Sequence, residues 1–486
     1  MYDVIVIGGG PAGVTAALRA RELGASVALV EGARLGGTGT HDGCAPTRVL
    51  VEAARLLRAA QRFDEYGLVG EPPQIDFPKL LAHARQMTKR LGEKKQLEQH
   101  LVRSGVRLFL DAGYARFSDL NTVTLEDGTD LQGGSFVICA GGRARRPDFP
   151  GSDLALTHSD IWFMKALPPS MAIGGGAATG CQLASIFAQF GSRVTILEQS
   201  VRLLEVEDSI ISEAMAQTFL QRGIELVFGV ESLDRIEKTS GRLRLYYRQH
   251  GILHHLEVDA VVLALGWSSN ADHLNVDVAG VQTDNGYIVV DQYLRTTAPH
   301  IYAAGDINGR MMLVQSASYE GRIAAENAVR GAGQRTMHTI VPHGAFTNPE
   351  YASVGLTEEE ARNVEQDPLI AVVPYADLDR AVIDDHADGY CKLIVSQSTH
   401  RILGAHIVGE QALEAIHLVA AGMVADMWVE HLAELELAYP TYSSVVGLAA
   451  RHLVRSLGMT PMAATWQALS GPLIAEPKRP ADPRHA

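Results

Sequence analysis

Cysteine is scarce in this chain of 486 residues, and its placement excludes several classes of protein. Only four occur, and no two of them form a CxxC pair: Cys44, Cys139, Cys181 and Cys391. This pattern excludes a CxxC metal site and the disulfide framework of a small secreted domain, so we expect no bound metal. Cysteines so few and so widely separated indicate a reducing compartment, and we expect a cytoplasmic protein.

A surplus of positive charge is also missing. The chain carries 42 Lys and Arg against 56 Asp and Glu, a formal net charge of −14. Sequence-independent binding of nucleic acid or of anionic membranes needs a basic face, so we expect neither. No apolar run approaches about eighteen residues, and no basic segment with a cleavage site precedes the first strand-like run. We therefore expect no membrane insertion and no export.

Glycine, in contrast, is abundant, and the length allows several domains. At about 150 residues per domain the chain is long enough for three, which favours a multidomain enzyme. With 47 glycines, tight turns and phosphate-binding loops are expected. The 47% apolar and 20% charged residues are an ordinary globular composition.

The first thirty residues follow the order strand, glycine turn, helix, strand. The run YDVIVI is followed by Gly8-x-Gly10-x-x-Gly13, an alanine-rich stretch, and a second apolar run closed by Glu31. In a dinucleotide-binding unit the glycines permit the tight turn, the approach of a pyrophosphate and close helix packing. A carboxylate at the end of the second strand accepts hydrogen bonds from a ribose diol. The segment therefore predicts a dinucleotide site.

A second unit of the same kind follows near residue 171. It carries Gly175-x-Ala177-x-x-Gly180 and ends in Glu198, and in both units the acid follows the last glycine by 18 residues. Ala177 stands where the middle glycine is expected, which alters the approach of a phosphate. The carboxylate of Glu198 favours the ribose of NADH and repels the 2′-phosphate of NADPH, so we expect NADH to be preferred.

The rest of the chain indicates a further domain and a tail. Gly305-Asp306 lies between a strand-like run and a helical stretch over about 312–329, where an acid can hold a ligand hydroxyl. From about residue 346 short alternating strands precede helices between 411 and about 458, which predicts an α+β domain. Residues 471–486 carry four prolines among charged residues, and we expect them to be disordered.

Two further segments, LGGTGTHDGCAPTR at 35–48 and FTNPEYASVGLT at 346–357, complete a resemblance to the flavoprotein disulfide reductases. That family includes dihydrolipoamide dehydrogenase, mercuric reductase and glutathione reductase. The resemblance implies an α/β fold: two Rossmann-like dinucleotide-binding domains plus a C-terminal α+β dimerisation domain that makes a homodimer. It implies an FAD-binding domain over 1–150 and 276–340, an NAD(P)H-binding domain over 151–275, and an interface domain over 341–470.

The same resemblance assigns cofactor contacts residue by residue, with Asp306 on the flavin ribitol. Expected FAD contacts are Gly8, Gly10, Gly13, Glu31, Thr38, Arg48, Gly113, Ala140, Gly142, Gly305 and Asp306. Expected NADH contacts are Gly175, Ala177, Gly180, Gln182, Glu198, Val230 and Gly266.

The departures from the family pattern concern its catalytic residues. The family has Gly-Gly-Thr-Cys-x-x-x-x-Cys-x-Pro, whereas here Gly39 replaces the first cysteine of the redox-active pair and Cys44 is the second. At the C-terminus Tyr439 replaces the histidine of His-Pro-x-x-x-Glu, and Ser444 replaces the glutamate. A phenol with a pKa near 10 is mostly a proton donor at neutral pH, unlike imidazole, so Tyr439 is a candidate catalytic residue as a donor; alternatively, it only packs. Both elements of dithiol–disulfide exchange are thus predicted to be absent.

Two residues of this loop invite a chemical role. Pro46 suggests that Cys44 begins a helix, whose dipole would lower the pKa of the thiol toward neutrality; alternatively, Cys44 only packs. Arg48 and Gln182 stand where the family has a lysine and a glutamate near flavin N5. Because Gln182 is uncharged, we expect less of the positive charge of Arg48 to be offset than in the family's lysine–glutamate pair, unless Arg48 pairs with another residue. His41, in the same loop, is a weaker candidate for facing the flavin.

Three functions remain open. The leading hypothesis is an oxidoreductase that passes a hydride from NADH to FAD and then directly to a small acceptor, quinone-like or other. The second is a single-cysteine peroxide or thiol–disulfide reductase that cycles through Cys44. The third is a non-catalytic flavin-binding redox sensor. A dithiol reductase would need a second thiol from a distant cysteine or from a partner.

Overall fold

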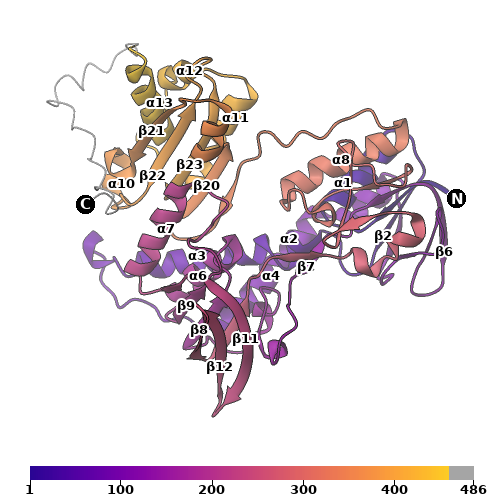
Figure 1. The fold of residues 1–486 in the computed structure, drawn as a ribbon, viewed down its shortest axis with the longest axis horizontal. Helices are drawn as coiled ribbons and strands as arrows, with labels where there is room; N and C mark the ends of the chain where they lie inside the picture. Colours follow the sequence, from indigo (N-terminus) through magenta and orange to yellow (C-terminus); the bar gives the residue numbers. More distant parts are fainter. Residues whose placement is uncertain (459–486) are drawn as a thin grey trace.

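The computed structural model describes residues 1–458; the expected disordered tail lies outside the described residues. A sheet of seven strands forms the first unit, at the right of Figure 1. Its order is β3 (Arg107–Leu110), β2 (Val27–Glu31), β1 (Tyr2–Ile7), β6 (Asp130–Ile138), β5 (Thr122–Thr124) and β4 (Arg116–Phe117), with β18 (Ile301–Ala303) also paired to β6. β1 runs parallel to both β2 and β6. Residues Val4 to Ile7 are buried, as an apolar strand in the middle of a parallel sheet should be.

Two helices cover one face of this sheet, next to the glycine turn. α1 (Pro11–Glu22) begins after the turn, and α8 (Val314–Arg330) packs beside it (Figure 1). A Cβ added to Gly321 of α8 would lie 2.2 Å from the carbonyl oxygen of Ala12, so the two helices touch through their backbones. Residues remote in sequence therefore return to the first unit.

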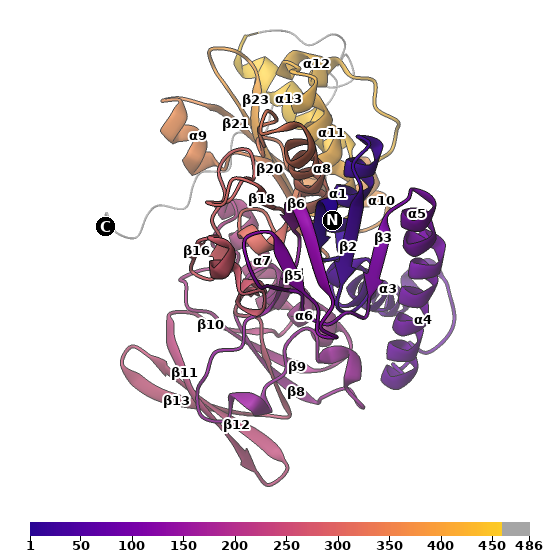
Figure 2. The same ribbon diagram turned by 90° about the vertical axis from the view of Figure 1, so that its right-hand side faces the viewer.

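The second unit repeats the plan with a smaller sheet. Its strands lie in the order β10 (Glu225–Val227), β9 (Arg193–Leu197), β8 (Ser170–Gly174) and β14 (Ala260–Leu263), all parallel. Its helices are α6 (Ala178–Gln189) and α7 (Ser209–Gln221). An antiparallel sheet of β11 (Val230–Thr239), β12 (Arg242–Gln249) and β13 (Ile252–Val258) projects from it (Figures 1 and 2). A ribbon of β7 (Gly142–Ala144) and β15 (Trp267–Ser269) joins the segments that enter and leave this unit.

Four helices lie between β2 and β3, and one of them begins at Cys44. They are α2 (Gly37–His41), α3 (Cys44–Ala60), α4 (Phe77–Lys95) and α5 (Leu97–Arg103). α3 buries Leu50 and Ala54 in the same apolar cluster as Phe77 of α4 and Phe187 of α6. Because one core spans α3 and α6, the loop that carries Cys44 is held against the second unit as well as the first.

The C-terminal region is an antiparallel sheet with helices on it, at the upper left of Figure 1. The strand order is β19 (His343–Ala345), β20 (Glu350–Gly355), β23 (Ile402–Gly409), β22 (Tyr390–Val395) and β21 (Leu369–Pro374). Its helices are α9 (Glu358–Val364), α10 (Asp379–Ile383), α11 (Ala412–Val424), α12 (Val429–Glu434) and α13 (Ser444–Ser456). The predicted α/β class with a C-terminal α+β region is thus confirmed. Within residues 1–458 no helix is long and apolar enough to cross a membrane.

Candidate nucleotide and thiol site

The first glycine turn has the geometry that a dinucleotide needs. Gly8 has φ +105°, and a Cβ there would lie 2.3 Å from the carbonyl oxygen of Cys139. A Cβ on Gly13 would lie 1.8 Å from the carbonyl oxygen of Gly8, so α1 sits directly on the turn. Gly10 caps α1, and its Cβ would meet no heavy atom nearer than 3.8 Å. The helix N-terminus is therefore open to a pyrophosphate, and the residues fit FAD.

Glu31 lies at the end of β2 with its carboxylate fixed by backbone groups. Its Oε2 accepts a hydrogen bond from the N–H of Gly9 (2.6 Å), and its Oε1 accepts one from Ala33 (2.7 Å). Gly113 packs beside it, since a Cβ on Gly32 would lie 2.4 Å from the carbonyl oxygen of Gly113. The structure thus brings Glu31 and Gly113 to one edge of the first sheet, and a fixed carboxylate suits a ribose diol.

Further predicted FAD residues follow the ends of β6 and β18. Ala140 follows β6, and its backbone nitrogen lies 3.0 Å from where a Cβ of Gly8 would be. Gly142 lies in β7, tight against the carbonyl oxygen of Ser268. Gly305 has φ +80° and precedes Asp306. Burial raises the pKa of Asp306, and the neighbouring carboxylate of Glu320 raises it further.

Glu320 is a residue that the sequence patterns did not single out. Its side chain is fully buried in α8. It accepts hydrogen bonds from the N–H of Gly305 (2.7 Å) and the amide of Asn308 (2.8 Å), and His338 Nε2 lies 2.8 Å from its other oxygen. An acid inside the apolar face of the helical stretch at 312–329 was the signal that could have found it. Glu320 holds the turn that presents Asp306.

The second glycine turn repeats the backbone geometry of the first. Gly175 has φ +102°, and its Cβ would lie 2.4 Å from the carbonyl oxygen of Ala264. A Cβ on Gly180 would lie 1.9 Å from the carbonyl oxygen of Gly175. Ala177 caps α6 with φ −80° and ψ −173°, an extended conformation that costs alanine nothing. Its methyl group distinguishes this turn from the first, at the place where a phosphate would approach.

Glu198 ends β9 in the same way as Glu31 ends β2. Its carboxylate accepts hydrogen bonds from the N–H groups of Gly176 and Ser200. Val230 starts β11 beside it, with its N–H 3.0 Å from the carbonyl oxygen of Glu198. Gly266 (φ +90°) lies where the chain leaves β14 for β15. Contacts of Val230 and Gly266 with a nicotinamide nucleotide stay a prediction.

The loop between Gly36 and Cys44 contains a short helix, α2. Thr38 lies in α2, and its carbonyl oxygen accepts hydrogen bonds from Asp42 and Gly43. Gly39 faces α8: a Cβ there would lie 2.9 Å from Cγ2 of Val314. A side chain at position 39 therefore requires Val314 to move. His41 is turned to the backbone, with Nε2 2.8 Å from the carbonyl oxygen of Leu35.

Cys44 is the first residue of α3, as its proline-containing sequence predicts, and part of its surface is accessible. The expected lowering of its thiol pKa is wrong. Burial, together with the carboxylate of Asp306, raises the pKa of the thiol, and a hydrogen bond to its backbone only partly opposes this. Desolvation by the surrounding protein thus outweighs the helix N-terminus.

The other three cysteines are buried in apolar clusters, which agrees with their interpretation as packing residues: Cys139, Cys181 and Cys391. Burial raises the pKa of each of these thiols, and that of Cys391 to about 12. All four cysteines of the chain are free in the structure.

Arg48 and Gln182 converge on one residue, but not as expected. The guanidinium of Arg48 lies 4.7 Å from the ring centre of Phe346, and its Nη1 lies 3.3 Å from Glu350 Oε1. Gln182 accepts a hydrogen bond from the N–H of Phe346 at 3.0 Å. The expectation of an unmatched positive charge is therefore wrong, because Glu350 of β20 supplies the carboxylate. The alternative, that Arg48 pairs elsewhere, is confirmed.

Asp42 is a second residue that sequence reasoning missed. Its carboxylate accepts hydrogen bonds from Ser159 (2.6 Å) and from the indole of Trp162 (3.0 Å), and His158 Nε2 lies 3.4 Å away. Burial opposes its ionisation, but the hydrogen bonds from His158 and Ser159 outweigh this and lower its pKa. Asp42 ties the loop before Cys44 to the segment that enters the second unit. No local sequence signal marks this pairing, since its partners lie more than a hundred residues away.

Tyr439, predicted as a catalytic residue, is 77% exposed and donates a hydrogen bond to Asp379 at 2.7 Å. That hydrogen bond raises the pKa of the phenol, which remains a proton donor. Ser444 begins α13 and lies 2.9 Å from the hydroxyl of Thr441. Within residues 1–458 no three His, Cys, Asp or Glu side chains are grouped so as to hold a metal ion.

Comparisons with known proteins agree with this geometry over nearly the whole chain. Mercuric reductase from Lysinibacillus sphaericus is 31% identical over 452 residues, which cover 92% of this chain and 82% of that protein. Dihydrolipoyl dehydrogenase from Bacillus subtilis (strain 168) is 30% identical over 466 residues, 92% of this chain and 97% of that protein. The structure of the HOCl-induced flavoprotein disulfide reductase RclA from Escherichia coli has a TM-score of 0.82 at 27% identity, with 92% and 99% of the two chains covered.

Two family models match successive parts of the chain. Residues 341–450 match the dimerisation domain of the pyridine nucleotide-disulphide oxidoreductases. Residues 2–321, which carry both glycine turns, both carboxylates and Cys44, match the model described as pyridine nucleotide-disulphide oxidoreductase. The chain belongs to the pyridine nucleotide-disulphide oxidoreductase family, whose members are FAD-dependent enzymes that use NAD(P)H.

Proposed function

We propose that the protein is a homodimeric FAD-dependent oxidoreductase that takes reducing equivalents from NADH and passes them directly to a small acceptor, without an active-site disulfide. One observation carries this proposal: Cys44 has no cysteine partner. Position 39 is glycine, Val314 lies against it, and the other three cysteines are buried in apolar clusters. Residues 341–450, matched to a dimerisation domain, support the homodimer.

FAD, when bound, supplies the two-electron chemistry, because it accepts a hydride from a nicotinamide and returns electrons to an acceptor. The residues of this chain hold the two nucleotides. Glu31 and Glu198, each fixed by two backbone N–H groups, are placed to accept hydrogen bonds from ribose hydroxyls. A carboxylate at position 198 repels a 2′-phosphate, which supports NADH over NADPH.

A quinone is the leading acceptor class, since it needs no thiol to receive two electrons and two protons. Metal ions form the other class to test. One relative is named mercuric reductase, and RclA has also been solved as a Cu(II) complex with a TM-score of 0.82 to this chain. An acceptor panel should therefore contain a quinone, Hg(II) and Cu(II).

Anaerobic titration of the purified FAD-bound protein with NADH tests the proposal. We expect two electrons per subunit, seen as complete bleaching of the flavin absorption with one equivalent of NADH. We also expect steady turnover with a quinone that is unchanged in Cys44→Ala, because the thiol is not part of the route. Uptake of four electrons would show a second redox centre, and loss of turnover in Cys44→Ala would show that the thiol carries electrons.

The accessibility of Cys44 favours the single-cysteine reductase as a second candidate. Against it, the pKa of the thiol is raised, so the thiol is protonated at neutral pH and the nucleophilic thiolate forms only as the pH rises. With a reference pKa of about 8.5, alkylation by iodoacetamide at pH 7 should be at least about thirtyfold slower than its alkaline plateau. Alkylation already at its plateau at pH 7, or a peroxide adduct on Cys44 in the intact mass, would favour this candidate.

A further inference from the structure

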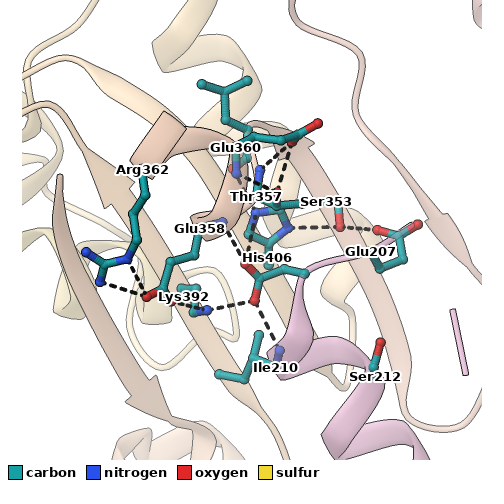
Figure 3. A network of polar contacts seen from close by, with 12 residues as sticks. Glu207, Ile210, Ser212, Ser353, Thr357, Glu358, Glu360, Arg362, Lys392 and His406 are labelled. Atoms are coloured by element: carbon teal, nitrogen blue, oxygen red, sulfur yellow. Dashed lines mark hydrogen bonds and ion pairs between the residues drawn. The ribbon is translucent and has the colours of Figure 1, made fainter. Parts of the chain in front are cut away.

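A buried ionic network joins the second nucleotide unit to the C-terminal sheet. Asp208 caps the N-terminus of α7, and the side chain of Lys392 in β22 donates to its Oδ1 at 2.7 Å. Both side chains are almost fully buried, at 1% and 5% exposure. The same ammonium donates to Glu358 Oε2 at 2.7 Å, and the N–H of Glu358 donates to Asp208 Oδ2 at 2.9 Å. Figure 3 shows Lys392 facing Glu358 and the first turn of α7 at Ile210.

The residue before Asp208 makes a parallel set of contacts. Glu207 accepts a hydrogen bond from the hydroxyl of Ser353 in β20 at 2.7 Å, and His343 Nε2 lies 3.3 Å from its other oxygen. His406 of β23 lies beside Ser353, with Nδ1 3.1 Å from the hydroxyl oxygen (Figure 3). Two consecutive acids of the second unit are therefore fixed to the C-terminal sheet, Glu207 through β20 and Asp208 through β22, with β23 between these two strands.

The segment that ends in these two acids begins directly after Glu198, the residue whose carboxylate is expected to bind the ribose of NADH. We call residues 199–208 the strap. Ser200 donates its N–H to Glu198 at 2.8 Å, and the N–H of Leu204 donates to the carbonyl oxygen of Gly176 at 3.0 Å. Leu203 packs on Gly176, because a Cβ added to Gly176 would lie 2.6 Å from Cδ2 of Leu203. The strap thus packs against the glycine turn and against Glu198. Its C-terminal end is held by the C-terminal sheet, outside the second unit.

β20 also contacts the flavin side of the molecule. Its first residue, Glu350, pairs with Arg48 of α3, and Ser353, three residues later, holds Glu207 of the strap. One strand of the C-terminal sheet therefore touches both the helix that starts at Cys44 and the segment that shapes the second nucleotide turn. A segment held by buried charges at one end has few alternative positions at the other.

We propose that Asp208 and Lys392 are positioning residues for NADH: their buried ion pair fixes the strap against the C-terminal sheet and so keeps Gly176 and Glu198 in the geometry that binds the nucleotide. The proposal rests on NADH being the electron donor of the proposed function. Both residues act through the strap and not by touching the nucleotide. Their loss should weaken NADH binding and leave FAD binding and the limiting rate of flavin reduction unchanged.

The test is the NADH concentration dependence of flavin bleaching under anaerobic stopped flow. The double variant Asp208→Asn/Lys392→Met removes both charges together, so that no buried charge of the pair is left unmatched, and the new amide side chain can still cap α7. We expect the half-saturating NADH concentration to rise about tenfold, with a limiting rate within about twofold and full FAD content. The matched control is Arg362→Met, which removes the more exposed cation on Glu358 without touching the strap, and should behave like the wild type.

A folded, FAD-replete double variant with an unchanged half-saturating concentration would overturn the proposal. If the double variant does not fold, Asp208→Asn alone decides, since it removes one charge of the pair and Lys392 keeps Glu358 as its counter-ion. A rise of about threefold supports the proposal, and no rise overturns it. Each comparison is a ratio to the wild type, so a wild type that takes up four electrons would refute the proposed function and leave this test intact. A wild type that NADH does not reduce would refute both, because the donor would be wrong.

Discussion

The two nucleotide units of this chain share a turn and differ in the loop beyond it. Gly8 and Gly175 have nearly equal φ values of +105° and +102°. Glu31 accepts a hydrogen bond from the N–H of Gly9, and Glu198 accepts one from the N–H of Gly176. The loop backbones also match at first, since Gly36 donates to the carbonyl oxygen of Gly9 (2.8 Å) as Leu204 does to that of Gly176 (3.0 Å). The shared part is the part that a dinucleotide requires.

After Gly36 and Leu204 the two loops lead to different parts of the molecule. In the first unit the chain continues through Gly39 into α3 and delivers Cys44 and Arg48. In the second it becomes the strap and ends in Glu207 and Asp208 on the C-terminal sheet. The comparison teaches that the glycine turn and its carboxylate are built from short-range contacts within each unit, whereas the loop after the carboxylate carries a feature particular to each: a thiol in one, an anchor in the other.

The largest effect should come from the third glycine of each unit. Gly13→Ala places a methyl group 1.8 Å from a backbone oxygen, and Gly180→Ala places one 1.9 Å from the equivalent oxygen. In each variant the helix that carries the substitution must therefore shift away from the turn. We expect Gly13→Ala to be purified without FAD. Gly180→Ala should keep FAD but lose NADH affinity by more than about 100-fold, since such overpacking costs ~1–3 kcal/mol or more. Flavin absorption and NADH titration measure the two outcomes; FAD loss in both variants would mean that the units are not independent.

A smaller effect is expected from the paired carboxylates. Glu198→Gln keeps the shape but removes the charge, and should raise the half-saturating NADH concentration about thirtyfold, since charged hydrogen bonds contribute ~1.5–3 kcal/mol. It should also bring NADPH close to NADH as a donor. The control is Glu31→Gln, which should weaken FAD retention and leave the choice between NADH and NADPH as in the wild type. Unchanged discrimination in Glu198→Gln would remove the carboxylate argument.

The thiol loop can be tested by restoring the missing cysteine. Val314 lies 2.9 Å from where the Cβ of residue 39 would be, so Gly39→Cys alone should form little disulfide with Cys44. In Gly39→Cys/Val314→Ala the added space should raise the disulfide fraction about tenfold, because relief of overpacking is worth ~1–3 kcal/mol. Thiol counts before and after reduction give the fraction, with Val314→Ala as control. Full disulfide in the single variant would show that Val314 is no obstacle.

The smallest effect concerns the altered position of the second turn. Ala177 already has an extended backbone, so Ala177→Gly removes only a methyl group at the helix N-terminus. We expect NADH to bind about threefold more tightly, since the change is worth under ~1 kcal/mol. The reciprocal Gly10→Ala should weaken FAD retention by a similar factor. Equilibrium dialysis or fluorescence quenching would resolve both, and tighter FAD binding in Gly10→Ala would contradict the equivalence of the two turns.

Much of the fold follows from local patterns in the sequence. The two strand–turn–helix–strand units, the acid at the end of each second strand and the helix that begins at Cys44 are each encoded within about thirty residues. The contacts of Arg48 with Glu350 and of Asp42 with His158 are not. Glu350 lies some three hundred residues from Arg48, and its carboxylate reverses the expected charge balance around that arginine.

The sequence by itself determined which nucleotide turns exist, where their carboxylates lie, and that Cys44 lacks a cysteine five residues before it. Those properties depend on backbone conformation and residue identity over short distances. Only the tertiary structure decided the pKa of Cys44, the partner of Arg48 and the anchoring of the strap by Lys392. Desolvation and charge pairing depend on which distant segments fold against a residue, and short-range sequence patterns do not record that.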